Sequence, residues 1–296
     1  MTLTQTPTTT GELAIHILEQ QVAAFLDHAP GARAGEDPLH VHQMRVATRR
    51  MRAALRLFSD VLPPEARSLN DELQWIADQL GPCRDLDVHI RRTRESGAAL
   101  GISAALVPYG AWLVHQRQQA QVALTAAMES PRFADLLHRL ATLSALPLVG
   151  DLALSQDAPR RLRQARRKLK KRADRLDRNS PPPDLHQVRI RAKRLRYAIE
   201  FFEPLYGKPA QRLVKRLTAL QDLLGDFQDG VVGGQRIREA VLTSAGAWPA
   251  ETSLALGQVV QYDLDRSRKV RKRFPRAYDD VMDNGWRRLE SKVAIS

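Results

Sequence analysis

The sequence predicts an all-α fold of two four-helix-bundle-like halves related by a pseudo-twofold axis. Two observations support this prediction. Apolar residues recur with helical spacing along nearly the whole chain, and no stretch alternates convincingly with the period of two that a half-buried strand requires. A segment also occurs twice, at an offset of 144 residues in a chain of 296. An offset of nearly half the length indicates one repeat unit present twice.

The repeated segment is a basic helix that opens with a histidine. Residues 41–58 read VHQMRVATRRMRAALRLF, and residues 185–202 read LHQVRIRAKRLRYAIEFF. The alignment places His42 on His186 and conserves the order of basic and apolar positions. Two such helices in one fold indicate a concentrated positive surface, which needs an anionic partner.

Domain boundaries and helices follow from the repeat and from the Pro and Gly punctuation. The Thr-rich residues 1–10 are expected to be disordered. One domain is expected over 11–293, with a first repeat at about 11–146 and a second at about 155–293. In the first half, apolar periodicity and stops at Pro30 and Gly81-Pro82 predict helices over 12–30, 39–60, 65–80, 85 onward, 107–128 and 132–143.

The second half repeats this order of helices. They are expected over 159–178, 185–206, a range ending at 225, a range starting near 229, 254–274 and 276–293. The segments LGPCRDLD and LGDFQDG each contain a glycine at a predicted helix end. We interpret Asp85 and Asp229 as N-caps of the following helices, and Asp87 as a second candidate partner for an arginine of the basic helix.

Composition points to phosphate as the partner's chemistry. The net charge is +13, and 37 arginines stand against 9 lysines. A guanidinium offers a planar fork of donors for phosphate oxygens, whereas an ammonium is a mobile point charge. Aromatic residues make up only 5% of the chain, which disfavours binding of single-stranded nucleic acid by base stacking.

The chain is expected to be cytoplasmic. Cys83 is the only cysteine, so no internal disulfide forms, and the N-terminus lacks a basic-then-apolar targeting signal. Residues 96–116 carry no charge, but they contain three glycines and a proline. We therefore expect a buried, interrupted helix there and no membrane span.

The first basic helix carries an arginine stripe beside its apolar stripe. On a helical wheel Arg45, Arg49, Arg52 and Arg56 fall within a narrow arc, with His42 at its edge. Like charges at this spacing repel one another, so the stripe is either a solvated face paired with carboxylates of neighbouring helices or an anion site. Its second copy favours the anion site.

The second stripe is less positive at its far end. Arg189, Lys193 and Arg196 occupy the stripe positions with His186 at the edge, but Glu200 stands where the first copy has Arg56. The helix over 160–178 adds further charge, either as a solvated exterior or as an extension of the anion site. Its candidate ligands are Arg163, Arg166, Arg167 and Lys170.

The histidines have two interpretations. At a helix N-terminus His42 and His186 are placed to donate a hydrogen bond to a phosphate oxygen, or to serve as structural caps. No group of His, Cys, Asp or Glu has metal-ligand spacing, and arginines repel cations, so no metal or other cofactor is expected. No phosphate-binding loop or paired catalytic carboxylates are recognisable, so no enzyme activity and no catalytic residue are expected.

The doubled motif with its downstream LGPCRDLD and LGDFQDG segments resembles the CHAD domain, a histidine-containing α-helical domain family. The resemblance covers about residues 11–293. It implies a helical protein with a basic central surface that binds inorganic polyphosphate and associates with polyphosphate granules. Carried over by position, the implied ligands are His42, Arg45, Arg49, Arg50, Arg52, His186, Arg189, Lys193, Arg194 and Arg196. The triphosphate-hydrolase domain of many relatives, with its E-x-E-x-K motif, has no counterpart here, so hydrolysis is not carried over.

Three functional readings remain open from the sequence. The first is a non-catalytic polyphosphate-binding protein. The second is a general polyanion or nucleic-acid-binding protein that uses phosphate contacts alone, and the third is a phosphohydrolase that uses His42 or His186. No membrane partner is expected, and the oligomeric state is left open.

Overall fold

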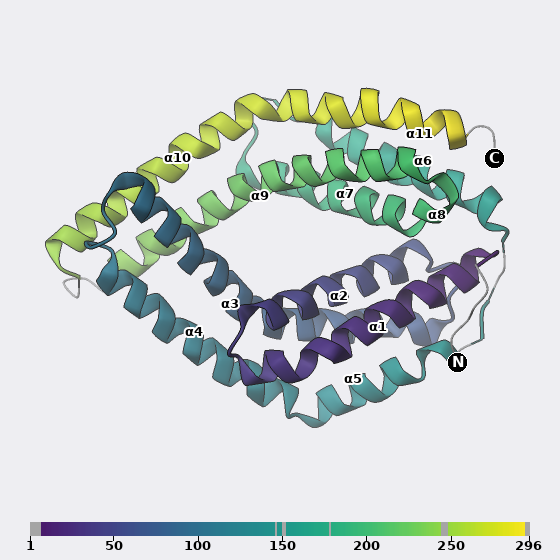
Figure 1. Ribbon diagram of the computed structural model, residues 1–296, viewed down its shortest axis with the longest axis horizontal. Coiled ribbons are helices and arrows are strands. Elements are labelled where there is room, and N and C mark those ends of the chain that lie inside the picture. Colours follow the sequence, from purple (N-terminus) through teal and green to yellow (C-terminus); the bar gives the residue numbers. More distant parts are fainter. Residues whose placement is uncertain (1–6, 146, 150–151, 178, 244–247, 294–296) are drawn as a thin grey trace.

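The computed structural model describes residues 7–145, 147–149, 152–177, 179–243 and 248–293, and this part of the chain is helical (Figure 1). It contains no strand beyond an isolated antiparallel bridge between Thr9 and Ala153. The all-α prediction is therefore confirmed. The helices are α1 Thr10–Ala34, α2 Pro38–Leu57, α3 Pro64–Leu100, α4 Val107–Met128, α5 Pro131–Ala141, η1 Leu143–Ala145, α6 Leu154–Ala173, α7 Pro182–Phe201, α8 Glu203–Tyr206, α9 Lys208–Thr243, α10 Ala250–Asp279, the π-helical η2 Asp280–Gly285 and α11 Trp286–Val293.

Some helix boundaries recur at the offset found in the sequence. The start and the end of α2 and α7 differ by 144 residues, and so do the starts of α3 and α9. Helices α1, α2 and α5 lie on one side of Figure 1, and α6, α7 and α9 lie on the other. The pseudo-twofold relation and the repeat boundaries stay predictions. Residues 1–6 lie outside the described part, and Thr9 caps α1 in a capping box with Glu12.

Several predicted helix ends are wrong; the helix expected over 254–274, for example, continues as α10 through Pro275 to Asp279. Helix α1 continues through Pro30 to Ala34, α3 passes through Gly81-Pro82, and α9 passes through Gly225. A proline inside a helix costs about 3 kcal/mol. Around Pro82, however, Leu80 and Cys83 are both fully buried. Because burial of an apolar side chain contributes about 1.5–3 kcal/mol, keeping these side chains in register with the core outweighs the local stop signal.

The N-cap interpretation of Asp85 and Asp229 is consequently wrong. Both lie in the interior of long helices. Asp85 lies 3.4 Å from Arg236 of α9, and Asp87 pairs with Arg117 of α4 at 2.7 Å, not with an arginine of α2. These carboxylates join neighbouring helices and do not cap them.

The main hydrophobic core draws on both halves. Phe58 at the end of α2 packs against Phe201 and Phe202 at the end of α7, with ring centroids 6.2 and 5.8 Å apart. Side chains on both sides of this contact belong to one continuous buried cluster. This shared core fixes α2 beside α7, and therefore one basic helix beside the other.

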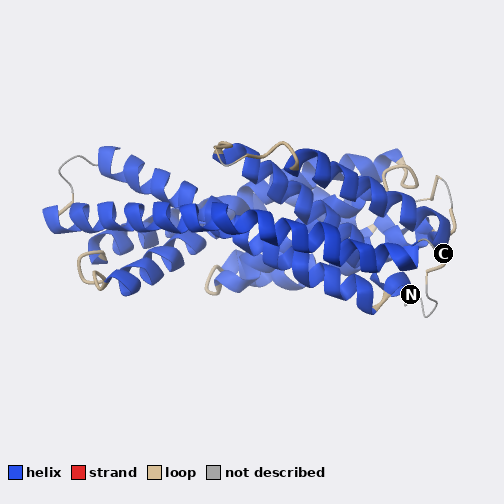
Figure 2. Cartoon of the chain, turned by 90° about the horizontal axis from the view of Figure 1, so that it is seen from above, coloured by secondary structure: helices blue, strands red, loops and turns tan. Residues whose placement is uncertain are grey.

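A second, smaller core lies where α3, α4, α9 and α10 extend away from the bundle, as the narrow arm on the left of Figure 2. Here Arg92 of α3 and Asp263 of α10 form a buried ion pair at 2.8 Å. The uncharged stretch over 96–116 falls at this end and is interrupted as predicted, because α3 ends at Leu100 and α4 begins at Val107. Its predicted burial is wrong for most of the stretch; Val107, for example, is 65% exposed. Within the described ranges no helix is long and apolar enough to cross a membrane.

Candidate anion-binding site

The two basic helices lie side by side at the centre of the molecule (Figure 1). Asp37 caps α2 by accepting a hydrogen bond from the Leu39 amide at 2.8 Å, and a proline at the first turn begins each basic helix. The apolar arc predicted for α2 is buried; Met44 and Met51, for example, have no exposed surface. With that arc in its own core, the neighbouring arginine stripe contacts both α3 and α7: Arg45 donates to a carbonyl of α3, and Arg49 donates to Tyr197 of α7.

The stripes meet in a group that we call the central cationic cluster. Its members are Arg45 and Arg49 of α2 and Arg189, Lys193 and Arg196 of α7. All five side chains are partly buried. The charge of each of the four arginines acts on Lys193, which lies among them. The structure therefore brings together five of the predicted ligands from segments 144 residues apart in the sequence.

Lys193 shows the electrostatic consequence most clearly. Burial lowers its pKa from 10.5 to about 7, and repulsion from Arg189, Arg49, Arg196 and Arg45 adds to the effect. In the described part of the chain, the ammonium group has no hydrogen bond or ion pair. Burial likewise lowers the pKa of Arg45 and of Arg189. A bound anion would relieve both causes at once.

Two glycines make room for the innermost arginines. A Cβ on Gly81 would lie 3.1 Å from Arg45 Nη1, and a Cβ on Gly225 would lie 3.2 Å from Arg189 Nη2. Arg45 Nη1 also donates to the Ala77 carbonyl at 3.0 Å, so its guanidinium lies flat against α3. The glycines predicted to end helices thus have a different role, because they permit close approach of a side chain.

The cluster is only partly neutralised by protein carboxylates. Glu200 forms ion pairs with Arg50 of α2 and Arg196 of α7, which accounts for the less positive far end of the second stripe. Asp229 acts on Arg189 through its charge, but burial raises the pKa of that carboxyl. The buried Arg189 Nε has no hydrogen-bond partner among the described residues. The interpretation of a face fully paired with neighbouring carboxylates therefore does not fit the cluster.

An aromatic side chain orders the middle of the site. Arg49 Nε donates to the Tyr197 hydroxyl at 2.5 Å. The guanidinium of Arg196 lies 4.7 Å from the Tyr197 ring centroid, and that of Arg50 lies 5.6 Å from it. Tyr197 was absent from the predicted site, because the equivalent position in the first repeat is Ala53.

The two histidines lie at the edge of the cluster. Burial lowers the pKa of His42 to about 4, and the charges of Arg84, Arg49 and Arg45 lower it further. Burial also lowers the pKa of His186, whose buried Nδ1 has no hydrogen-bond partner in the described structure. Both rings are thus neutral at pH 7, and the structure leaves both of their interpretations open. Arg84 of α3 was missed because it lies outside the repeated basic helix.

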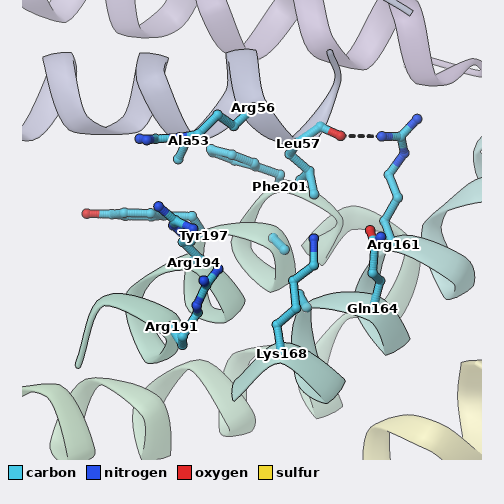
Figure 3. Close-up of a pocket in the computed structure, with 12 residues that line it drawn as sticks. Ala53, Arg56, Leu57, Arg161, Gln164, Lys168, Arg191, Arg194, Tyr197 and Phe201 are labelled. Carbon is cyan, nitrogen blue, oxygen red and sulfur yellow. Dashed lines mark hydrogen bonds between the residues drawn. The ribbon is translucent and has the colours of Figure 1, made fainter. Parts of the chain in front are cut away.

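A cavity of about 260 Å³ opens between α2, α6 and α7, next to the stripes (Figure 3). We call it the lateral cavity. Tyr197 and Phe201 form part of its apolar wall, and Arg161 is held at one side by the Leu57 carbonyl and by Asp60. Its basic lining residues are Arg56, Arg161, Lys168, Arg191 and Arg194. Two of these, Arg56 and Arg194, were predicted ligands.

The remaining predicted ligands have separate positions. Arg52 Nε lies 3.4 Å from Asn70 Oδ1, toward α3. On α6, Arg166 stacks 5.0 Å from the Trp286 ring centroid, and Lys170 pairs with Asp174 at 2.5 Å. None of the four predicted α6 ligands, Arg163, Arg166, Arg167 and Lys170, lines the lateral cavity. Lys168 of α6 and Arg191 of α7 line the lateral cavity instead. A helical wheel of α6 alone does not show which part of its polar surface faces α7.

Among the described residues, no group of three or more His, Cys, Asp or Glu side chains comes together. The candidate site therefore consists of guanidinium, ammonium and imidazole donors around little acceptor charge. Such a set suits oxyanions, phosphate above all.

Known proteins resemble this chain in sequence and in fold. The CHAD domain family model matches residues 16–238. The uncharacterized protein Rv2226 of Mycobacterium tuberculosis is 28% identical over 253 residues, which cover 80% of this chain and 47% of that protein. The chain thus spans about half the length of the curated relatives it matches.

Two solved structures share the fold. The CHAD domain from the plant Ricinus communis superposes with a TM-score of 0.72 at 26% identity, covering 97% of this chain and 92% of that one. PptA from Streptomyces chartreusis superposes with a TM-score of 0.73 at 21% identity, covering 93% of this chain and 100% of that one. The family model spans most of the chain, and the helical architecture agrees with it. The chain belongs to the CHAD domain family.

Proposed function

We propose that this protein binds inorganic polyphosphate through the central cationic cluster, without hydrolysing it, and that it associates with polyphosphate granules. The observation that carries the proposal is the position of Lys193, among four arginines and with no carboxylate partner in the described residues. Polyphosphate carries about one negative charge per phosphate, and its binding to such donors releases counterions as on nucleic acid. It supplies the acceptor charge that the cluster lacks.

The arrangement favours an extended ligand. The stripe on α2 runs from Arg45 in the cluster to Arg56 in the lateral cavity, which is about 16 Å along a helix. Arg191 and Arg194 continue the positive surface there. A single orthophosphate would contact only one end of this path, whereas a flexible phosphate chain would follow it.

The aromatic side chains at this site offer little exposed surface on which a nucleic-acid base could stack. Tyr197 and Phe201 are each only 3% exposed and already pack against arginines or the core. Nucleic acid would have to bind through phosphate contacts alone, so it is a competitor in the test. Hydrolysis through His42 would need a general acid and an orienting carboxylate, and the charges that act on its ring are arginines.

The test is competition binding at physiological salt. Labelled long-chain polyphosphate is displaced by unlabelled polyphosphate, duplex DNA, RNA or ATP, with free phosphate monitored in the same tubes. We expect polyphosphate to displace the label at far lower concentration than nucleic acid, and no phosphate to be released. Equal displacement by nucleic acid would reduce the function to general polyanion binding, and released phosphate would favour a hydrolase.

Matched variants locate the site. Arg45→Ala with Arg189→Ala should weaken polyphosphate binding by more than about 100-fold, since a hydrogen bond to a charged group contributes about 1.5–3 kcal/mol and two such groups are removed. The slope of log affinity against log salt should fall by about two. Lys269→Ala with Lys272→Ala removes the same charge from the exposed face of α10 and is the control. Equal losses in both double variants would contradict a defined site.

A further inference from the structure

The amine of Lys193 lies among the four arginines of the central cationic cluster. It follows Arg189 by four residues and precedes Arg196 by three on α7, while Arg45 and Arg49 approach from α2. Its side chain is partly exposed, so small solutes reach it from solution.

The carboxylates near the cluster are engaged with arginines. Glu200 pairs with Arg50 and Arg196, and the charges of Asp222 and Asp229 act on Arg189. Across the described residues, Lys193 itself has no hydrogen bond or ion pair. The charges of Asp78 and Asp85 act on Arg45. The ammonium form of Lys193 is thus repelled by four arginines, while the nearby carboxylates act on those arginines and do not pair with the ammonium group itself.

This setting changes the chemistry of the amine. With a pKa of about 7, a substantial fraction of Lys193 carries an unprotonated amine at physiological pH. An unprotonated amine is a nucleophile, and lysines in desolvated, cation-rich sites are activated in this way. The surrounding arginines, being permanently charged, do not compete as nucleophiles but do favour any product that is an anion.

We propose that Lys193 is a carbamylation site: when no polyanion is bound, its Nζ adds reversibly to carbon dioxide and the resulting carbamate is held by the guanidinium groups of the cluster. The amine lone pair attacks the carbon of CO₂, the N–C bond forms as one C–O π bond opens onto oxygen, and one proton leaves the nitrogen for water. The step involves no oxidation or reduction. It turns a cationic side chain into an anionic one.

The cluster fits this product better than it fits the free amine. A carbamate offers two oxygens in the planar geometry that an arginine fork binds. Arg189, four residues before Lys193 on the same helix, has a buried Nε without a hydrogen-bond partner in the described structure, so the cluster holds unused donor capacity. The new negative charge replaces a repulsion among five cationic positions with attraction to four of them.

Carbamylation and polyphosphate binding would exclude each other. A polyanion favours the ammonium form of Lys193 and occupies the same guanidinium donors, so dissolved CO₂ should weaken polyphosphate binding. This consequence rests on the proposed function, whereas the carbamate itself does not.

The test uses the intact chain and carbon-13-labelled bicarbonate, with the carbamate carbon observed by NMR near pH 8. We expect a carbamate resonance in the wild type and in the control Lys269→Arg, whose side chain is exposed on α10. The signal should fall at least tenfold in Lys193→Arg. Absence of a wild-type resonance, or its persistence in Lys193→Arg, would overturn the proposal.

A second measurement does not depend on the folding of the variant. Carbamates on wild-type protein are trapped as esters with a trialkyloxonium reagent and located by peptide mapping. Modification concentrated at Lys193 supports the proposal, and modification absent or spread evenly over exposed lysines refutes it.

Addition of polyphosphate to the NMR sample separates the two proposals. A resonance in a protein that fails to bind polyphosphate removes the proposed function alone, and binding without any resonance removes carbamylation alone.

Discussion

Replacing Lys193 with methionine should stabilise the anion-free protein at neutral pH. Methionine keeps the length and flexibility of the lysine stem and its packing, but it removes the charge that the cluster repels. The four arginines and the burial that act on Lys193 stay in place. The substitution therefore isolates the cost of holding one ammonium group in this position.

The size and the pH dependence of the gain follow from the pKa. In the unfolded chain Lys193 has an ordinary pKa of 10.5, and in the folded protein the pKa is about 7. Between these values the unfolded chain binds a proton that the folded protein does not, so wild-type stability rises with pH across this window. The penalty is fully present below about pH 7 and has vanished above about pH 10.5. The gap corresponds to about 5 kcal/mol at most, and solvent screening of this partly exposed side chain leaves about 1–3 kcal/mol.

Urea unfolding followed by far-UV circular dichroism measures the effect in chloride buffers free of phosphate and sulfate. We expect the variant to exceed the wild type by about 1–3 kcal/mol at pH 7 and by much less near pH 10. Other groups titrate in this range, among them Cys83 and Tyr206 with raised pKa values. They act equally in both proteins and cancel in the difference. A gain that is the same at both pH values, or a loss at pH 7, would refute the electrostatic explanation.

Three further substitutions probe the surroundings of the cluster. Glu200→Gln leaves Arg50 and Arg196 without their carboxylate. We expect the free energy of unfolding in urea to fall by about 1–3 kcal/mol and polyphosphate to bind several-fold more tightly in titration calorimetry. Unchanged affinity would contradict the pairing. Gly225→Ala should add up to about 0.5–1 kcal/mol of helix stability yet weaken binding several-fold, because the new Cβ lies 3.2 Å from Arg189 Nη2 and shifts this guanidinium slightly. Unchanged affinity would contradict a role for this arginine in its present position. Asp263→Ala leaves the buried Arg92 with only the longer ion pair to Asp226, at 3.9 Å, and should cost about 3 kcal/mol, whereas adding Arg92→Met should recover most of the loss. A small effect of the single change would contradict a buried ion pair.

The fold was largely readable from the sequence. Periodicity and the offset of 144 residues identified the helices and placed the two basic ones at matching positions. The errors came from local stop signals, at Pro30, Gly81-Pro82 and Gly225, that tertiary burial overrides. A single sequence shows that a glycine weakens a helix, but it does not show whether a side chain from another helix needs that space. The spaces opposite Gly81 and Gly225 are set by packing between helices distant in the sequence.

The candidate site was predictable to the extent that it lies on the repeated helix. Arg45 and Arg189 were found because each is part of a stripe that a helical wheel displays. The α6 residues were misplaced, since a helix with basic residues on most of its polar surface gives no indication of which side faces a neighbour. Lys168 contributes to the lateral cavity, while Arg166 rests on Trp286 of α11. The packing of α6 against α7 decides which of these basic residues faces the cavity, and the sequence of α6 alone does not show it.

Helices α2 and α7 match in their bounds at an offset of 144 residues but differ in charge, and this difference gives the site a direction. Where α2 ends in Arg56, the matching position of α7 is Glu200, which neutralises Arg50 of one half and Arg196 of the other. Positive charge therefore remains uncompensated around Lys193 and again in the lateral cavity, with a locally neutralised segment between them. A long polyanion bound along α2 would be held most strongly at the two ends of this path. For a long chain, neutralising either end alone should therefore cost much of the affinity. For a short chain, either single change should cost little and only the double change should abolish binding, because a short chain cannot engage both ends at once and the intact end still binds it.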